Sequence, residues 1–344
     1  MLRTRTARRF AVPAAIATGA VAVAGGVGIV MANADDLPDK TADQVLSDLQ
    51  NSDVDGFSGT VTQTADLGLP NSGTGSGAAS LSSGEHKLGV MYSGEQNQAK
   101  VSQQGDVKET SYIRDADKLY KWNSQSGESF EYTLSGDAAT NPIMPVGAWW
   151  PGATAEKAAD SAKNAELSLG DEVNIAGYDA YTLIMTPTED SALADKVEIA
   201  VEAETGMPIG TKVFAEDGTE PVFSVTYDEL NMETPAPENF EFKAPEGSKV
   251  EDKGEFGISG SDPSLLGSGF TSIGTMEATE EEIKEFFVEE GVSGDAVQAW
   301  IDEAKQVDGG KVLESTLVNA YLTDDGRLYV GSVTPDALIE AASH

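Results

Sequence analysis

The sequence predicts an α+β fold in which one large, curved antiparallel sheet carries helices on one side. Between Gly177 and Val250, apolar and polar residues alternate in four runs, which is the period of a strand with one buried face. The turns Glu204-Thr-Gly206 and Glu216-Asp-Gly218 supply the glycine that a tight hairpin needs. No repeat of roughly 20 to 50 residues indicates a propeller or a solenoid. The alternating positions are Tyr181, Leu183 and Met185, then Val197, Ile199 and Val201, then Ile209, Thr211 and Val213, and finally Phe223, Val225 and Tyr227.

Residues 1–34 have the features of an export signal. Four arginines precede an uncharged, mostly apolar run from Phe10 to Met31, and Ala32-Asn-Ala34 matches a signal-peptidase site. The apolar run is about 22 residues long, close to the roughly 20 that cross a bilayer, so a cleaved signal peptide and a retained signal anchor both stay open. Both predict that the protein is exported and extracytoplasmic, either secreted or tethered to the outer face of the cytoplasmic membrane through residues 10–31.

The composition excludes several classes of protein. The chain has no cysteine, so it forms no disulfide and carries no lipoprotein acylation site. It has 58 acidic and 22 basic residues and a net charge of −36, which is expected to repel nucleic acid and anionic lipid headgroups. A solvated acidic coat is the simplest interpretation of this charge, and cation binding is the alternative. No run matches the calcium-loop pattern, and no metal site is predicted.

One short helix and a series of short strands are predicted ahead of Gly177. Thr41 and Gln44 match a capping box that begins a helix ending near Gln50. Residues 68–84 are rich in glycine and serine and predict a flexible loop. A second helix is expected from Thr154 to about Asn164. The expected strands are Gly56–Gln63, Leu88–Tyr92, Ala99–Gln103, Glu109–Arg114, Leu119–Asn123, Phe130–Leu134 and Glu166–Ile175.

The C-terminal part of the chain differs in composition. Residues 254–269 are rich in glycine and serine and predict a linker, followed by an α+β extension over residues 270–344. Helical spacing is present in 280–290 and 295–306, and Asp324-Asp-Gly326 predicts a hairpin. Thr334-Pro335 predicts the start of a closing helix. The extension is expected to pack on the main sheet, either as a small appendage or by adding strands to it.

Several segments resemble the LolA/RseB-like periplasmic lipoprotein-carrier superfamily, in its branch of exported actinobacterial proteins. The resemblance covers about two thirds of the chain after the leader and marks strands and turns rather than chemistry. The segments are the helix before Gly56-Phe-Ser-Gly-Thr-Val61, then Gly177–Pro187, Glu204-Thr-Gly-Met-Pro208, Pro237–Val250 and Leu313–Pro335.

This resemblance implies a half-open β-barrel over residues 35–253, with helices covering an apolar concave face that holds acyl chains. In the carriers such a groove takes lipoprotein acyl groups, and in the RseB-like relatives a similar fold binds an anti-sigma factor. The glycine and serine loop at 68–84 and the acidic helical insertion at 279–306 depart from the family pattern. These departures argue against carrying the partner contacts of the relatives over to this chain.

Catalysis is not expected. His86 and His344 are the only histidines, so the chain has very few side chains for a Ser-His-Asp triad or a histidine metal site. Two carboxylates can hydrolyse glycosides, but in so acidic a chain some pair always has suitable spacing. No cofactor is predicted. The expected function is a non-catalytic carrier or sensor, and the alternative is a membrane-anchored regulatory protein that binds an anti-sigma factor or another envelope membrane protein.

Lipid or lipoprotein acyl chains are the expected ligand. Trp149 and Trp150 lie in a proline-broken loop, where they form either a plug in the core or a flap over the mouth of a lipid groove. The aromatic residues of the alternating strands belong either to an ordinary core or to the wall of that groove. The predicted groove residues are Met91, Tyr112, Trp122, Phe130, Tyr132, Met144, Trp149 and Trp150.

Overall fold

The computed structural model describes residues 37–344 except 53, 69–82, 95–96, 105–108, 125, 135–150, 216–217, 245–247, 256–263, 290–292 and 344. The predicted leader, most of the 68–84 loop, Met144, Trp149, Trp150 and His344 lie outside the described residues. Everything described belongs to one compact unit, Ala32–His344.

Thirteen of the described strands form the main sheet. Each predicted strand before Gly177 has a counterpart, although Glu166–Ile175 divides into two strands at Gly170. The strands are β1 (Gly56–Asp66), β2 (Ser83–Ser93), β3 (Gln98–Gln104), β4 (Glu109–Asp115), β5 (Lys118–Asn123), β6 (Ser129–Thr133), β7 (Ala165–Leu169), β8 (Val173–Ile175), β9 (Tyr178–Pro187), β10 (Ala194–Glu202), β11 (Pro208–Ala215), β12 (Phe223–Asn231) and β13 (Val250–Glu255).

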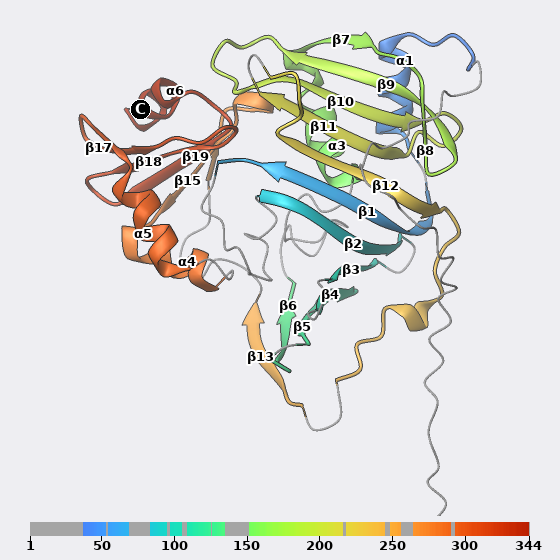
Figure 1. The fold of residues 1–344 in the computed structure, drawn as a ribbon, viewed down its shortest axis with the longest axis horizontal. Helices are drawn as coiled ribbons and strands as arrows, with labels where there is room; N and C mark the ends of the chain where they lie inside the picture. The colour runs from blue at the N-terminus through green and yellow to red at the C-terminus, as the bar shows by residue number, and fades with distance from the viewer. Residues whose placement is uncertain are drawn as a thin grey trace, which may run out of the picture. The chain divides into compact units, whose positions relative to one another are not determined.

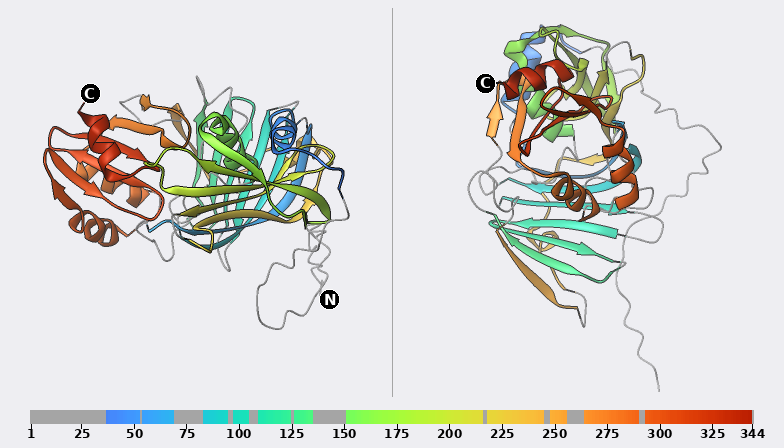
Figure 2. Two further views of the ribbon diagram at one scale, coloured as in Figure 1. Left: turned by 90° about the horizontal axis from the view of Figure 1, so that it is seen from above. Right: turned by 90° about the vertical axis from the view of Figure 1, so that its left-hand side faces the viewer.

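The strand order is β13-β6-β5-β4-β3-β2-β1-β12-β11-β10-β9-β7, with β8 also paired to β9. The two meanders, β1 to β6 and β9 to β12, join through the antiparallel pair of β1 and β12. Only β13, among the described strands of this sheet, pairs in parallel, lying along β6. The described strands form an open path between β13 and β7. Figures 1 and 2 show how this sheet curves around two helices.

The register confirms the four predicted alternating runs. Leu183 lies opposite Ile199, Val213 opposite Phe223, and Tyr227 opposite Val61, so the apolar positions share one face of the sheet. This face is called the inner face here, because α1 (Ala42–Gln50) and α3 (Pro151–Asp160) lie against it. Together with the curved open sheet, the two helices confirm the predicted α+β class.

Polar contacts are present at the N-terminal end of each helix. Thr41 and Gln44 form the predicted capping box, with the Gln44 amide donating to Thr41 Oγ1 at 3.3 Å and the Thr41 amide donating to Gln44 Oε1 at 2.8 Å. The first helix buries Val45 and Leu49 and contacts β7, β9 and β10. The second begins at Pro151, whose carbonyl accepts from Thr211 Oγ1 on β11 at 3.1 Å. It ends at Asp160, and the predicted remainder to Asn164 forms the 3₁₀ turn η2 (Ala162–Asn164).

The hairpin between β10 and β11 approaches α1 closely at Gly206. This glycine has φ +73°, a conformation that costs other residues strain. A Cβ atom there would lie 2.3 Å from the carbonyl oxygen of Asp48 at the end of α1. The predicted glycine therefore provides both the turn and the room for the helix.

The C-terminal residues form their own six-stranded sheet instead of extending the main one. Its order is β14-β15-β19-β18-β17-β16, and every described pair is antiparallel. The strand at Ser264–Leu266 falls inside the predicted linker. The elements are β14 (Ser264–Leu266), η4 (Gly269–Thr271), β15 (Ile273–Glu277), α4 (Glu280–Glu289), α5 (Gly294–Asp302), β16 (Lys305–Val307), β17 (Gly310–Leu313), β18 (Asn319–Thr323), β19 (Arg327–Gly331) and α6 (Pro335–Ala342).

Backbone hydrogen bonds tie this smaller sheet to the main one. Between β9 and β10, Leu193 N donates to Ser332 O at 3.0 Å, and Ser191 O accepts from Thr334 N at 2.8 Å. At the end of β1, Leu67 O accepts from Thr316 N at 3.1 Å. Partly buried side chains that pack against the main core from this side are Phe270 and Leu317.

Candidate functional site

The inner face continues from the helix-covered strands onto β2, β3, β4, β5 and β6. The described contacts of α1 and α3 with the sheet are chiefly with β7 and β9 to β12. Beyond them, one row of opposed residues runs from strand to strand as Val90, Val101, Tyr112, Lys121 and Phe130. The next row is Tyr92, Ala99, Arg114, Leu119 and Tyr132.

Three of the predicted groove residues share this face. Tyr112 is buried on β4, and Phe130 and Tyr132 are half-buried on β6. Because opposed and alternate residues point to the same side of a sheet, these side chains belong to one surface together with the buried Val101 and Leu119.

Met91 and Trp122 lie on the opposite, outer face of the same strands. Met91 belongs to the row of Lys100, Ile113 and Tyr120, and Trp122 is opposite Ser111 and Ser129. The structure therefore divides the predicted set between two faces. Met144, Trp149 and Trp150 lie outside the described residues.

The chain after β12 packs on the outer face. The ring of Phe242 stacks on Tyr120 with centroids 4.9 Å apart and an interplanar angle of 16°. Phe240, at the end of the 3₁₀ turn η3 (Pro237–Asn239), is fully buried. The alternation in the sequence predicted strands, but it did not show which face of the sheet the segment with Phe240 and Phe242 would cover.

Three cations lie on the inner face among its apolar side chains. Arg114 is fully buried, and its Nε donates to Ala116 O at 3.2 Å. Lys121 Nζ lies 5.5 Å from the centroid of the Tyr112 ring, and Lys253 Nζ on β13 lies 4.9 Å from that of Phe130. These residues were not among the predicted groove residues. Arg114 is two positions from Tyr112 on β4, and Lys121 is two positions from Leu119 on β5, so the alternation along each strand already placed them on the same face.

Burial sets the electrostatics of Arg114. Desolvation lowers the pKa of its guanidinium from the ordinary value, and the interaction with Tyr92 opposes that change. Lys253 also forms an ion pair with Glu251 at 2.8 Å on the same strand. The register places Glu251 opposite Phe130, so this pair belongs to the inner face as well.

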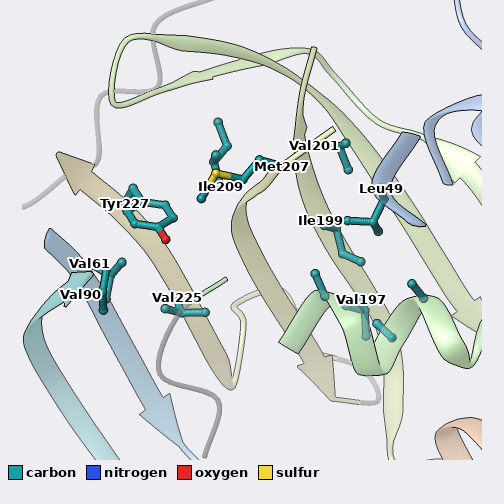
Figure 3. Close-up of a cluster of buried hydrophobic side chains, with 14 of the residues drawn as sticks. Leu49, Val61, Val90, Val197, Ile199, Val201, Met207, Ile209, Val225 and Tyr227 are labelled. Carbon is teal, nitrogen blue, oxygen red and sulfur yellow. The ribbon is translucent and has the colours of Figure 1, made fainter. Parts of the chain in front are cut away.

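Tyr227 lies where the two meanders meet. Its ring packs edge to face on Phe57 with centroids 6.0 Å apart, and it covers Gly59, where a Cβ would lie 3.0 Å from the tyrosine Cδ1. Figure 3 shows it beside Val61, Val90 and Val225. No group hydrogen-bonds the buried Tyr227 hydroxyl in the structure as described, and burial raises its pKa well above the ordinary value.

Among the described residues, His86 is the single histidine. His86 is half-buried, its Nε2 lies 2.9 Å from Ser83 O, and its Nδ1 lies 3.4 Å from Gln103 Nε2. In this part of the chain, no group of three or more His, Cys, Asp or Glu side chains could hold a metal ion. None of the described helices combines the length and the apolarity that crossing a membrane requires.

Comparison with protein-family models and with curated proteins gives no match. Among solved structures, the chain is similar to the MucA/MucB complex of Pseudomonas aeruginosa, with 16% identity over 88% of this chain and 96% of that chain and a TM-score of 0.47. A crystal structure of MucB matches with 16% identity, 87% and 94% coverage and a TM-score of 0.46. A LolA superfamily protein from Nitrosomonas europaea matches with 12% identity, 59% and 99% coverage and a TM-score of 0.25.

Proposed function

We propose that this protein is an exported, non-catalytic carrier or sensor that binds acyl chains of lipids or lipoproteins on the inner face of the main sheet. One observation carries the proposal, namely that the apolar inner face extends past the strands that α1 and α3 contact. Val90, Val101 and Leu119 continue it there, with Tyr112, Phe130 and Tyr132 beside them.

The size of this surface suits an acyl chain. Five neighbouring strands at a spacing of ~4.8 Å make the face of β2 to β6 roughly 19 Å wide. Each methylene removed from water contributes ~0.8 kcal/mol, so a chain of ~14 carbons contributes ~11 kcal/mol before the cost of association. No catalytic residue is needed for binding of this kind.

The test is a titration of delipidated protein with a fluorescent fatty acid. Wild-type protein should bind it saturably at micromolar concentration or below. Tyr132→Ser, on the inner face, should weaken binding several-fold, because it removes an aromatic ring from the wall. Tyr120→Ser removes the same atoms from the outer face and should leave the affinity unchanged.

Two outcomes would count against acyl-chain binding. One is the absence of saturable binding at micromolar probe, and the other is an equal loss of affinity in both tyrosine variants, with thermal melts showing both folded. If binding is absent and one envelope membrane protein is captured specifically by the full chain, the regulatory alternative gains instead.

A further inference from the structure

We propose that the hydroxyl of Tyr227 donates a hydrogen bond to the carbonyl oxygen of an acyl ester or amide, and so fixes where the acyl chain begins on the inner face. This inference rests on the proposed function and names the chemical class of its ligand. Tyr227 lies on β12 opposite Val61, and Val61 lies opposite Leu88 on β2. The hydroxyl is therefore at the border between the strands that α3 contacts and the apolar rows of β2 to β6.

The ring of Tyr227 is held in place by its neighbours on β1. It packs edge to face on Phe57, with centroids 6.0 Å apart. A Cβ at Gly59 would lie 3.0 Å from the tyrosine Cδ1 and 3.1 Å from its Cε1, so a side chain at that position would displace the ring. The phenylalanine and the glycine together fix the place of the ring and hence of its hydroxyl.

The hydroxyl adds nothing to the packing of this ring. Tyr227 is 2% exposed, and its hydroxyl has no hydrogen-bond partner among the described residues. A buried hydroxyl without a partner destabilises a fold, whereas phenylalanine would keep the same ring contacts without that cost. Burial also raises the pKa of Tyr227 well above its ordinary value, so the hydroxyl keeps its proton and can donate at neutral pH. Binding of an acceptor would recover what the empty hydroxyl loses.

The surroundings of the hydroxyl favour a neutral carbonyl as that acceptor. Figure 3 shows Tyr227 among the apolar side chains of Val61, Val90 and Val225. A buried water needs about three polar partners, which these side chains do not supply. A buried anion would need several donors or a cation. An ester or amide carbonyl needs one donor, and the alkyl groups on either side of it suit apolar neighbours.

The hydroxyl is enclosed in this structure, so a carbonyl reaches it only when a neighbouring side chain moves. Met207 belongs to the same buried cluster, and its unbranched side chain adapts readily to new packing. The acyl chain replaces the apolar contacts that a displaced side chain loses, and the carbonyl provides the acceptor. Ligand entry therefore exchanges apolar contacts for apolar contacts and gains one hydrogen bond.

Two lipids that differ in one carbonyl test this inference. A 1-acylglycerol and the 1-alkylglycerol of the same chain length each compete with the fluorescent fatty acid for the delipidated full chain. The ratio of ester affinity to ether affinity should be ~3–10-fold higher in the wild type than in Tyr227→Phe, because the variant loses one hydrogen bond to the ester. The ether should bind both proteins equally. Tyr321→Phe removes a hydroxyl that donates to Asp308 O at 3.2 Å in the smaller sheet, and it should leave both affinities unchanged.

A second measurement does not depend on affinity. The infrared carbonyl stretch of a ¹³C-labelled ester should lie at lower frequency in the wild-type complex than in the Tyr227→Phe complex, because a hydrogen bond weakens the C=O bond. The Tyr321→Phe complex should give the wild-type frequency.

Each contrary outcome has a distinct meaning. The same ester-to-ether ratio in the wild type and in Tyr227→Phe, or the same carbonyl frequency, would overturn the role of the hydroxyl and leave acyl-chain binding in place. An equal loss of affinity for both lipids in the folded variant would show that the residue only packs against the chain, and the inference would fail. Absence of binding of the probe and of both lipids to the wild type would refute the proposed function itself.

Discussion

The side-chain amide of Asn319 donates through Nδ2 to the carbonyl oxygen of Val333 at 2.9 Å, and both atoms are buried. The Oδ1 atom of the same amide accepts from Ser315 N, also at 2.9 Å. Val333 forms an isolated β-bridge to Ala192, in the connection between β9 and β10. Next to Ser315, the Thr316 amide donates to Leu67 O at the end of β1. One buried amide therefore bonds two of the segments by which the smaller sheet contacts the main one.

Asn319→Ala should lower the free energy of unfolding by ~1–3 kcal/mol, because it leaves the buried Val333 carbonyl and the partly buried Ser315 N–H without their side-chain partner. Hydrogen exchange should accelerate at Leu193 and Thr316, whose amides bond across the two sheets. Asn239→Ala removes an amide that bonds Ala236 O at 2.9 Å in an exposed turn, and it should cost much less. If Asn319→Ala left exchange at those two amides unchanged, the amide would not be what joins the sheets.

Gly206 and Gly177 provide a matched comparison of two left-handed glycines. Gly177 has φ +89° and open space around its absent Cβ, so Gly177→Ala should cost only the conformational strain, ~1 kcal/mol. Gly206→Ala should cost ~2–4 kcal/mol, because the methyl group also meets Asp48 O of α1. Chemical denaturation of both variants measures the difference. Similar losses would show that α1 moves away freely.

The stability that the capping box gives to α1 should depend on an oxygen acceptor at residue 41 and not on threonine itself. Thr41→Ala should destabilise the protein by ~1 kcal/mol, since the Gln44 amide loses its acceptor. Thr41→Ser keeps an oxygen at the same place and should retain most of the stability. A denaturant series on both variants checks this, and an equal effect of alanine and serine would argue against the cap.

Tyr227 should make the free energy of unfolding fall more steeply with increasing pH in alkaline solution. Its folded pKa is raised well above 10.0 by burial, whereas the unfolded side chain ionises near its ordinary value. Its contribution is therefore complete below about pH 10 and is lost as the pH rises from there towards the folded pKa, by up to ~1.4 kcal/mol per pH unit. Tyr227→Phe should remove that slope in unfolding experiments above pH 10, at little cost at neutral pH. Identical slopes in both proteins would contradict the burial of this hydroxyl.

The sequence predicted the strands of the second meander well because each has one apolar and one polar face. Leu183, Ile199 and Val225 each belong to an alternating run of their own strand, and the register aligns the three runs on one face. Thr41 and Gln44 gave the start of α1 because a capping box is a local signal. The parallel pairing of β13 with β6 could not be predicted, since residue type does not show which distant edge a strand will join.

Of the five candidate groove residues that the structure describes, Tyr112, Phe130 and Tyr132 share the inner face and the other two do not. Met91 and Trp122 were grouped with Tyr112 by residue type, while the alternation of each strand places them on the outer face. Arg114 and Lys121 were overlooked because charged residues are usually assigned to the solvent side. Their alternate positions with Tyr112 on β4 and Leu119 on β5 already indicated the inner face.

Photolabelling tests the location and the existence of the acyl site together. The delipidated protein is irradiated with a fatty acid that carries a diazirine in its chain, and the labelled peptides are sequenced by mass spectrometry. We expect saturable labelling on the inner face, at Tyr112, Phe130 or Tyr132, that excess unlabelled fatty acid suppresses. Labelling concentrated at Met91 and Tyr120 on the outer face, or no saturable labelling at all, would contradict it.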